Sequence, residues 1–537
     1  LMATQPTQAE SVAIPKRLPL VLEPENRDES TDKDAKLVNG YMERSRDGKE
    51  YWIYKRPGLK QIGDAHVGTG LGVYNWQGVI YAIFGSTLYR YSTGPNPVGT
   101  ALGTVGATGG MYRFCSSLGT TPRLQLGNGV ISFNYDPVNG LVPITTTATI
   151  AAGSFITAIS YTIASVGTTD FTLIGAASNT VGVTFLATGP GTGTGTATTT
   201  SNFPVPCVKG WVYLDGTTYV MSPTAYIHGS DTTPGMNRPD LWTDLLNTVG
   251  AQIEPDQGVY LAKQLVYALA LKEWSTEVFY DAQNPPGASP LGPVQGAKLN
   301  YGCVSADSVQ EIDGMLIWLT TNRSSAVQVI LVDNLKAAVV STKAIERLLG
   351  EADFTSIASM GVKYEGHRFY ILTLKNSNLT LVYDLTDQMW SQWTDVNGDY
   401  FKMVASTFYT GTARILQHES NGKLYLLGAE YFADDGEPIT VDLYAPNFDG
   451  GVRRRKQLNM MEFIGDQTPG SVLQVRVNDA DYAADKWSTF RYVDMGVKKP
   501  VLVNCGTFMR RTVHIRHQAN TRLRLQAIEL QIDIGTL

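Results

Sequence analysis

The chain has few of the residues that usually carry out chemistry. It contains only six His in 537 residues, and its four cysteines lie at long intervals with no CxxC pair: Cys115, Cys207, Cys303 and Cys505. Such spacing favours neither a disulfide framework nor a zinc site. We therefore expect four buried structural thiols, as is common for cysteine.

Long apolar runs are also missing. No stretch reaches the roughly 18 uninterrupted apolar residues that a membrane helix needs, and the N-terminal residues contain no apolar core of a secretory signal. We expect a soluble chain that is made in the cytoplasm and does not insert into a membrane.

The residues that are abundant predict an all-β protein. Apolar residues make up 43% of the chain and charged residues 17%, with 53 Gly and 27 Tyr. Thr, Val and Tyr stand in short runs between turn residues, which is typical of strands. The length exceeds what one hydrophobic core usually serves, so we expect two or three domains.

One device recurs along the chain: two β-rich runs separated by a short turn, with about 45 to 55 residues to the next such pair. Radial repetition of this kind is typical of β-propellers. We predict a six-bladed propeller. The six units cover residues 79–91, 124–135, 264–280, 314–332, 367–385 and 413–431.

Residues 142–206 interrupt this repetition. They carry a single charged residue, Asp170, and alternate Thr with Val over several short runs, which predicts a small inserted β module. Residues 211–220 form a strong hairpin signal, because Asp215 and Gly216 suit a type I′ turn. We expect only two short helices, at 238–249 and at 341–350, the second ending at Gly350.

The composition changes after Gly450 and Gly451. Strict alternation near the C-terminus, as in residues 512–516, predicts a separate antiparallel β domain with one solvated face. The predicted organisation is an extended arm at 1–50, a propeller at 51–141 and 207–450 that is interrupted by the module at 142–206, and a sandwich-like platform domain at 451–537.

The charge is unevenly distributed. Residues 451–537 contain 14 Lys or Arg against 8 Asp or Glu, a net charge of +6, while the rest of the chain carries −12. The sharpest basic run is Arg453, Arg454, Arg455 and Lys456. It has two interpretations of about equal weight: a docking surface for an acidic partner or nucleic acid, or the solvated start of a strand.

We find no pattern of residues that predicts catalysis. His514 and His517 lie three apart on a predicted strand, so their side chains should face opposite sides. Asp395, Asn397 and Asp399 begin like a calcium loop, but Ser406 stands where such a loop has Glu, and a hairpin turn explains the same residues. We expect no catalytic residue, metal or cofactor, and no enzyme activity.

Five blocks, in their order, resemble the packaged-DNA stabilisation proteins, the tail hub or nozzle subunits of short-tailed phages. The blocks are LVNGYME at 37–43, KRPGLKQIG at 55–63, QIEPDQGVYLAKQLVYALALKEWSTEVFYD at 252–281, GCVSADSVQEIDGMLIWL at 302–319, and KYEGHRFYILTL with LVYDLTDQMWSQW within 363–393. The inserted SYTIASVGTTDFTLIGAASNTVGVTF resembles an insertion found in many unrelated phage virion proteins.

The resemblance implies a hexameric ring in the virion tail. Such a ring lies below the portal and its adaptor, retains packaged DNA, and conducts the DNA outward without sequence-specific binding. Its implied partners are the adaptor ring, tail spikes or fibres, and a tail needle or plug. Two alternatives remain open: a carbohydrate-binding or glycan-cleaving propeller of the virion, and a scaffold propeller unrelated to phages.

Overall fold

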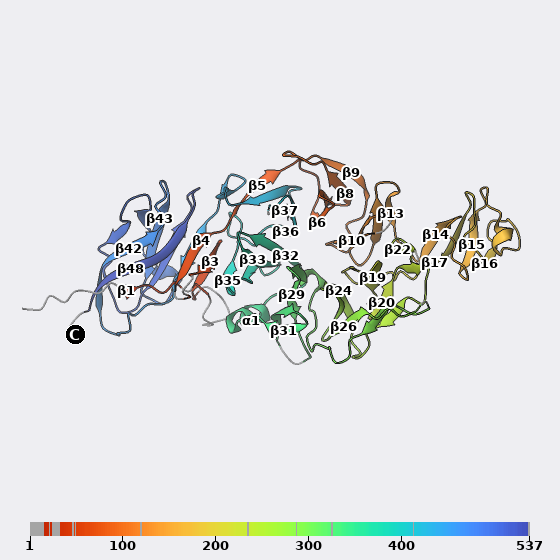
Figure 1. The fold of residues 1–537 in the computed structure, drawn as a ribbon. Helices are drawn as coiled ribbons and strands as arrows, with labels where there is room; N and C mark the ends of the chain where they lie inside the picture. Colours follow the sequence, from red (N-terminus) through yellow and green to blue (C-terminus); the bar gives the residue numbers. More distant parts are fainter. Residues whose placement is uncertain are drawn as a thin grey trace, which may run out of the picture.

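The structure is a computed structural model of an elongated molecule. Two β-sheets of the C-terminal region lie at one end, the inserted module lies at the other end, and a ring of sheets lies between them (Figure 1). The described residues are 16–20, 22–23, 33–45, 48, 50–118, 121–233, 236–285, 287–323, 326–411 and 413–534. None of the helices in these ranges is both long and apolar enough to cross a membrane.

Seven antiparallel units of four strands each make up the ring, and we call them blades 1 to 7. Five of them are separate sheets, blade 6 is part of a nine-stranded sheet, and blade 7 is part of a six-stranded sheet. Blade 1 contains β6 (Gly70–Trp76), β7 (Val79–Phe84), β8 (Thr87–Tyr91) and β9 (Gly99–Thr104). Blade 2 contains β10 (Arg113–Ser117), β11 (Arg123–Gly127), β12 (Ser132–Asp136) and β13 (Gly140–Pro143). Blade 3 contains β18 (Val212–Leu214), β19 (Thr217–Met221), β20 (Tyr226–Gly229) and β23 (Thr248–Gly250).

The other four blades follow in chain order. Blade 4 contains β24 (Gly258–Gln264), β25 (Tyr267–Lys272), β26 (Thr276–Asp281) and β27 (Leu291–Pro293). Blade 5 contains β28 (Gln310–Ile312), β29 (Met315–Thr320), β30 (Gln328–Asp333) and β31 (Lys336–Val339). Blade 6 contains β32 (Ile357–Tyr364), β33 (His367–Leu374), β34 (Leu379–Asp384) and β35 (Met389–Gln392). Blade 7 contains β36 (Met403–Phe408), β37 (Arg414–His418), β38 (Leu424–Gly428) and β5 (Gly58–Ile62).

The all-β propeller is confirmed, but the predicted number of six blades is wrong for the described residues. The additional sheet is blade 3, whose first hairpin contains the predicted turn at Asp215 and Gly216. Its outer strands β18 and β23 have only three residues each. A short hairpin of β21 (Asp231–Thr233) and β22 (Met236–Arg238) also separates β20 from β23. The blade therefore lacks the two long runs that mark the other units.

The ring is closed by an N-terminal strand. β5 pairs antiparallel with β38, with Leu59 opposite Leu427 and Ile62 opposite Leu424. The first strand of blade 7, β36, in turn lies against the first strand of blade 1, β6. Strand β5 also pairs with β39 (Ala433–Asp434), which continues into β40 (Glu437–Pro438). Closure of this kind leaves the sheets of a propeller with short, protected edges.

Glutamine side chains join neighbouring blades at four seams. In blade 7, the fully buried Gln417 donates to the Ile83 carbonyl (2.7 Å) and accepts from the Gly72 N–H (2.8 Å) of blade 1. Gln125 and Gln264 act similarly toward the next blade, and Gln310 of blade 5 donates to the Ser359 carbonyl. An amide both donates and accepts, so one side chain satisfies both kinds of main-chain group.

Two further sheets pack face to face in the C-terminal region and enclose one core. One contains β3 (Gly40–Arg44), β4 (Tyr51–Lys55), β48 (Arg524–Ile534), β42 (Lys456–Gly465) and β45 (Val501–Val503), with β1 (Lys16–Arg17) and β46 (Thr507–Phe508) at its margins. The other contains β41 (Val441–Tyr444), β47 (Thr512–His517), β43 (Val472–Asn478) and β44 (Arg491–Asp494). Residues of both sheets, among them Ile53, Phe463, Leu443 and Ile515, share the buried core.

This sandwich also takes strands from N-terminal residues. Strands β3 and β4 form a hairpin of the sandwich. The predicted domain bounds gave residues 1–50 to an extended arm and residues 51–55 to the propeller, while the family resemblance led to the hypothesis that parts of residues 20–60 belong to the platform. Strand β2 (Lys36–Val38) lies between β35 of blade 6 and β41. One nine-stranded sheet therefore runs from the propeller into the sandwich.

The buried Arg56 lies at the same junction. Its guanidinium donates to Asp434 (3.0 Å), to the Asn39 side chain (3.0 Å) and to the Thr394 carbonyl (3.3 Å), and it is 1% exposed. These partners belong to the N-terminal segment, to the residues after blade 6 and to strand β39 after blade 7. The buried guanidinium is thus paired with a carboxylate and hydrogen-bonded within the protein, which offsets the cost of burying its charge.

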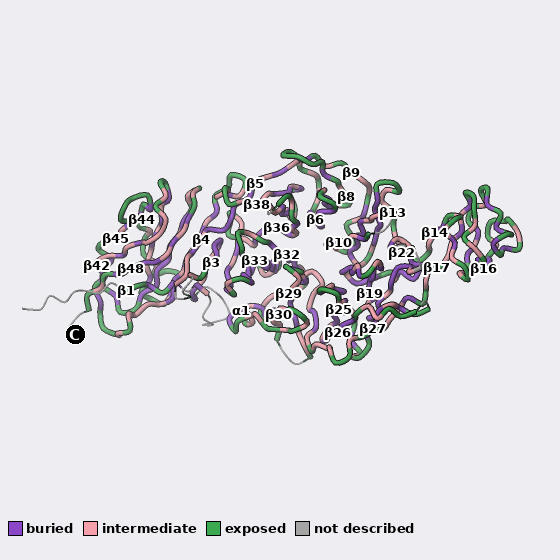
Figure 2. Tube along the Cα trace, in the orientation of Figure 1, coloured by how far each residue is buried: buried purple, intermediate pink, exposed green. Residues whose placement is uncertain are grey.

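The inserted module forms a sheet of its own. Its strands, in sheet order, are β14 (Thr147–Ala151), β17 (Thr196–Thr200), β15 (Ser160–Ser165) and β16 (Thr184–Leu186), with a 3₁₀ turn η1 (Phe171–Ile174). One face covers a small core that includes Tyr161, Phe171 and Phe185. Figure 2 shows this buried interior together with mostly exposed loops at the far end of the module.

One of the two predicted helices exists. Helix α1 (Lys343–Gly350) begins after Thr342, which caps the Ile345 N–H, and its last residue is Gly350 as expected. The helix predicted at 238–249 is wrong. There, the buried Asp231 accepts the N–H groups of Thr243 (2.6 Å) and Asp244 (2.9 Å), so these groups are not available for helical hydrogen bonds.

The four cysteines are buried and unpaired, as predicted. Burial raises the pKa of the Cys115 thiol and of the Cys303 thiol to about 12. Both therefore stay protonated and inert at neutral pH.

We predict that Gln417→Leu lowers the free energy of unfolding by about 2–4 kcal/mol. The substitution leaves the Gly72 N–H and the Ile83 carbonyl buried without a partner, at about 1–3 kcal/mol for each lost partner. Urea unfolding followed by tryptophan fluorescence measures the change. The exposed Gln252 provides a control, because Gln252→Leu should change stability by less than about 0.5 kcal/mol. Equal stability of both variants would show that the seam amide is dispensable.

The buried His517 makes the sandwich sensitive to acid. Burial, and to a lesser degree the Lys55 ammonium, lowers the pKa of His517 from 6.5 to about 3. Between these pH values the unfolded chain binds a proton that the folded chain excludes, so stability falls as the pH decreases. We predict that His517→Gln removes about 3 kcal/mol of the stability loss between pH 7 and pH 4.

Urea unfolding of parent and variant at both pH values measures this difference. The neighbouring exposed Gln518 provides a control, since Gln518→Ala should keep the pH dependence of the parent. A variant with His517 replaced and an unchanged pH dependence would contradict the assignment.

Candidate docking surface

The three arginines of the basic run lie on an exposed loop between β41 and β42. Arg453, Arg454 and Arg455 are all exposed. No carboxylate in the described ranges forms an ion pair with any of them. The loop follows Gly450 and Gly451, whose φ angles of 63° and 77° are in the left-handed region that favours glycine. This turn places the three side chains in solvent.

Lys456, the fourth member of the run, is not part of this exposed surface. It is 1% exposed, and its ammonium donates to the carbonyls of Arg454 and Met509, at 2.8 Å each. Burial lowers the pKa of Lys456. Its place at the start of β42, opposite Phe508 and Ile534, forces the side chain inward. Lys456 therefore fixes the loop and cannot contact a partner from this position.

The N-terminal strand β1 meets the same loop. Lys16 donates to the Gly450 carbonyl (2.6 Å) and is itself exposed. Met509, whose main-chain carbonyl accepts from the Lys456 ammonium, is 56% exposed. We call Lys16, Arg453, Arg454, Arg455 and Met509 the basic surface. It combines an apolar contact with guanidinium groups that have no ion-pair partner among the described residues and that can bind carboxylates or phosphates.

Other arginines of the sandwich already have internal partners. Arg511 is 5% exposed and forms a bidentate pair with Asp479, at 2.7 and 2.8 Å. Arg516 donates to Asp442 at 2.8 Å. Burial raises the pKa of Asp442, but its hydrogen bonds to His514 and Arg516 and their charges together lower the pKa by more. The net shift of the Asp442 pKa is therefore downward. The local sequence could not separate these paired arginines from the exposed ones.

The two histidines of β47 contact different groups. The His514 ring stacks on Tyr444, with centroids 4.0 Å apart, and lies 2.7 Å from Asp442. His517 lies 3.1 Å from the Ser471 hydroxyl. The two side chains are therefore not placed for one shared ion.

One group of three side chains in the described residues has the composition of a metal site: His367, Asp384 and Asp387. His367 Nδ1 lies 2.6 Å from Asp384 and 3.5 Å from Asp387. Burial lowers the pKa of His367, but the hydrogen bond and charge of Asp384 raise it by more. The net shift of the His367 pKa is therefore upward. The second oxygen of each carboxylate accepts a main-chain N–H, from Thr386 and from Arg44. The group is thus explained as a buried ion pair.

The residues that begin like a calcium loop form a turn. Asp395 accepts the N–H groups of Asn397 and Asp399, both at 2.9 Å. The ends of the segment, Thr394 and Tyr400, form a single β-bridge. The Asp395 carboxylate thus stabilises the turn by accepting two main-chain hydrogen bonds.

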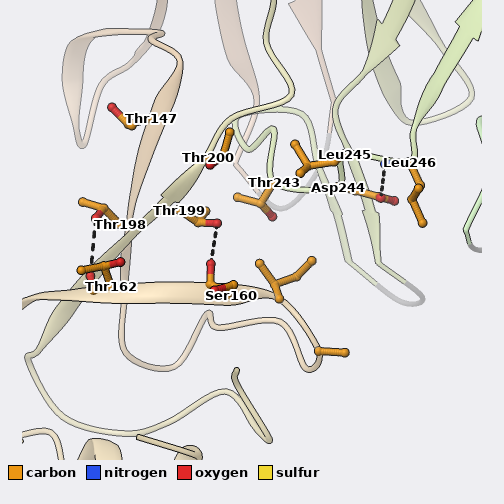
Figure 3. A pocket seen from close by; sticks show the side chains of 12 residues that line it. Thr147, Ser160, Thr162, Thr198, Thr199, Thr200, Thr243, Asp244, Leu245 and Leu246 are labelled. Carbon is orange, nitrogen blue, oxygen red and sulfur yellow. Dashed lines mark hydrogen bonds between the residues drawn. The ribbon is translucent and has the colours of Figure 1, made fainter. Parts of the chain in front are cut away.

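Three open clefts are relevant to the glycan alternative, and each contains a single carboxylate. The first lies between the module sheet and residues 243–246 and is lined by hydroxyls, with Asp244 and two exposed leucines (Figure 3). In the second, Glu254 pairs with Lys298 near Trp274. The third lies beside β14, where Asp240 pairs with Arg123 (3.3 Å). Glycoside hydrolysis normally needs two facing carboxylates.

The fold and this surface can now be compared with known proteins. A family model described as bacteriophage P22 Gp10, beta-propeller, matches residues 38–425, which is most of the chain. The chain belongs to this phage protein family. The match begins at Val38, the last residue of β2, covers six complete blades, and ends inside β38 of blade 7. The basic surface lies outside the matched range, so the family assignment does not extend to it.

Solved propeller structures are also similar to the chain, at low identity. An inactive variant of virginiamycin B lyase from Staphylococcus aureus is 7% identical with a TM-score of 0.38, over 69% of this chain and 99% of that chain. The WD40 propeller domain of Doa1 is 9% identical with a TM-score of 0.35, over 70% and 97%. No curated protein sequence matches significantly. Membership of the phage family therefore rests on the family model.

We predict that Lys456 and the three arginines differ in their effect on stability. Lys456→Met should lower the free energy of unfolding by about 1–3 kcal/mol, because two main-chain carbonyls lose their charged donor. Arg453→Ala, Arg454→Ala and Arg455→Ala should each change it by less than about 0.5 kcal/mol. Thermal and urea unfolding measure these differences. Destabilisation by the arginine substitutions would mean that the loop is structural.

Proposed function

We propose that the chain is a structural subunit of the tail nozzle of a short-tailed phage. In this proposal, six copies form a ring below the portal and its adaptor, retain the packaged DNA and conduct it outward during ejection. The observation that carries the proposal is the match of the phage family model to nearly the whole propeller. The resemblance of the five sequence blocks supplies the ring and its partners.

The physical properties of the chain support a role under load. The ring of blades is closed by β5, and one continuous sheet joins it to the sandwich. Such a body resists opening because pulling on one strand loads a complete ladder. The −12 charge outside residues 451–537 would repel DNA and thereby limit sticking in the channel.

The basic surface is the part that we assign to adaptor binding. Three guanidinium groups that form no ion pair with any described residue can bind carboxylates of an acidic partner. The module lies at the opposite end of the molecule (Figure 1). We assign it to contacts with spikes or fibres, and we expect a needle or plug to close the channel below the ring.

The assignment to adaptor binding predicts a defect in tail assembly. A phage with Arg453→Glu, Arg454→Glu and Arg455→Glu should produce particles that lack the chain and lose their DNA, because the reversed charges repel an acidic partner. Sedimentation, protein composition and electron microscopy of the particles measure the outcome.

A matched control reverses three exposed basic residues elsewhere in the sandwich: Lys498→Glu, Lys499→Glu and Arg522→Glu. This variant should assemble normally. Complete tails in the loop variant would contradict the docking assignment, and an equal defect in both variants would assign attachment to the overall charge of the sandwich instead of the loop.

A further inference from the structure

Two strand edges line the cleft between the module and blade 2. The cleft has a volume of about 500 Å³. On one side it is lined by residues 147–151, which are strand β14, and on the other by residues 142–145, which are the end of β13 and the residues after it. Both are terminal strands of their sheets. An unpaired strand edge is a template for another strand.

The main chain of β14 directs alternate groups into this cleft. The hydrogen bonds Ala152 N–H to Gly195 and Ser201 N–H to Thr146 (2.9 and 2.8 Å) show that even-numbered residues of β14 pair with β17. In an antiparallel ladder the intervening residues point their N–H and C=O groups the other way. Thr147, Thr149 and Ala151 therefore direct them away from β17, where the structure places no further described strand.

Two of these outward carbonyls already accept hydrogen bonds within the chain. The Thr147 carbonyl accepts from the Thr145 hydroxyl, and the Ala151 carbonyl accepts from the Ser154 N–H. The three outward N–H groups and the Thr149 carbonyl have no hydrogen bond to any described residue. Three donors and one acceptor along one edge match what an added strand needs.

Strand β14 also lacks the usual protection of an edge. Its sequence, Thr-Ala-Thr-Ile-Ala, contains no charge and no proline, the features by which edges normally avoid pairing. The two charged residues that line the cleft, Arg123 and Asp240, pair with each other (3.3 Å), and Arg123 also pairs with Asp136 (2.8 Å) outside the lining. The surroundings therefore suit an extended segment that is polar or apolar and carries little charge.

Two buried polar atoms of lining residues have no partner within the described part of the chain: the Asn134 side-chain oxygen and the Trp242 indole nitrogen. Both residues are more than nine-tenths buried, with 6% and 1% exposed. Unpaired buried polar atoms are rare in folded proteins and call for a partner. Both atoms belong to residues that line the cleft, although the atoms themselves are buried.

We propose that β14 accepts an extended segment of another virion protein as an added β-strand. Main-chain hydrogen bonds would give the affinity, and the cleft between blade 2 and the module would select side chains of low charge. A segment that pairs with all five residues would span about 17 Å, at about 3.4 Å per residue. The proposal rests on the proposed function in one respect, since it takes the partner from the virion.

Hydrogen–deuterium exchange with single-amide resolution tests this proposal. The amides of Thr147, Thr149 and Ala151 should exchange at least about tenfold more slowly in intact particles than in the purified chain. The amides of Ala148 and Ile150 serve as an internal reference, because they pair with β17 in both states.

Two proline variants test whether the added strand pairs with the outward N–H groups of β14. Thr149→Pro removes an outward N–H and leaves the ladder to β17 intact, which is where an edge tolerates proline. It should abolish the slower exchange of Thr147 and Ala151 in particles. Thr184→Pro makes the matched change on β16, at the opposite edge of the module sheet. Residues 183 and 187 bond to residues 163 and 159, so the Thr184 N–H points outward as well. This variant should leave the slower exchange of Thr147 and Ala151 unchanged.

The outcomes separate this inference from the proposed function. Particles that contain the chain but show unchanged exchange at β14 would overturn the inference and leave the tail assignment standing. Slower exchange in the concentrated purified chain alone would identify the occupant as a second copy and would also overturn it. Particles without the chain would overturn both.

Discussion

Strand β5 reaches blade 7 from the N-terminal side and completes its sheet, so residues far apart in the chain are held in one ladder. Without this pairing, β38 would expose an edge and the seam between blades 7 and 1 would lose its support. The buried Gln417 strengthens that seam by binding a donor and an acceptor of blade 1 at once. Closure thus depends on main-chain hydrogen bonds between the two ends of the propeller, and these are cooperative with the packing of every blade.

The same N-terminal segment also joins the propeller to the sandwich. Strand β2 bridges β35 and β41, and the β3–β4 hairpin becomes part of the sandwich. The buried Arg56 binds three segments at this junction. The segment from Lys36 to Ile62 therefore connects both bodies.

Much of the fold could be predicted from the sequence. Alternation and turn residues identified six of the seven blades, the module and helix α1, because these signals are local. Blade 3 was missed because its outer strands are three residues long and its repeat is broken by the module and a short hairpin. The false helix at 238–249 had apolar residues at helical spacing, but Leu245 and Leu246 are 54% and 62% exposed, and Asp231 binds the local N–H groups instead.

The candidate site was predictable only in part. The exposed arginines followed from the basic run itself. The inward turn of Lys456 depends on the pairing of β42 with β46 and β48, about 50 and 75 residues away along the chain, which local patterns do not encode. The strand edge of β14 likewise requires the order of strands in the module, and this order departs from the chain order.

An electron cryo-microscopy reconstruction of the intact particle would show both the ring of blades and its neighbours in the tail. We expect a closed seven-bladed ring in each subunit, with residues 58–62 paired to residues 424–428 and the loop at 453–455 against an acidic neighbour. An open ring, or a particle in which the chain is absent from the tail, would refute the closed ring and the tail assignment.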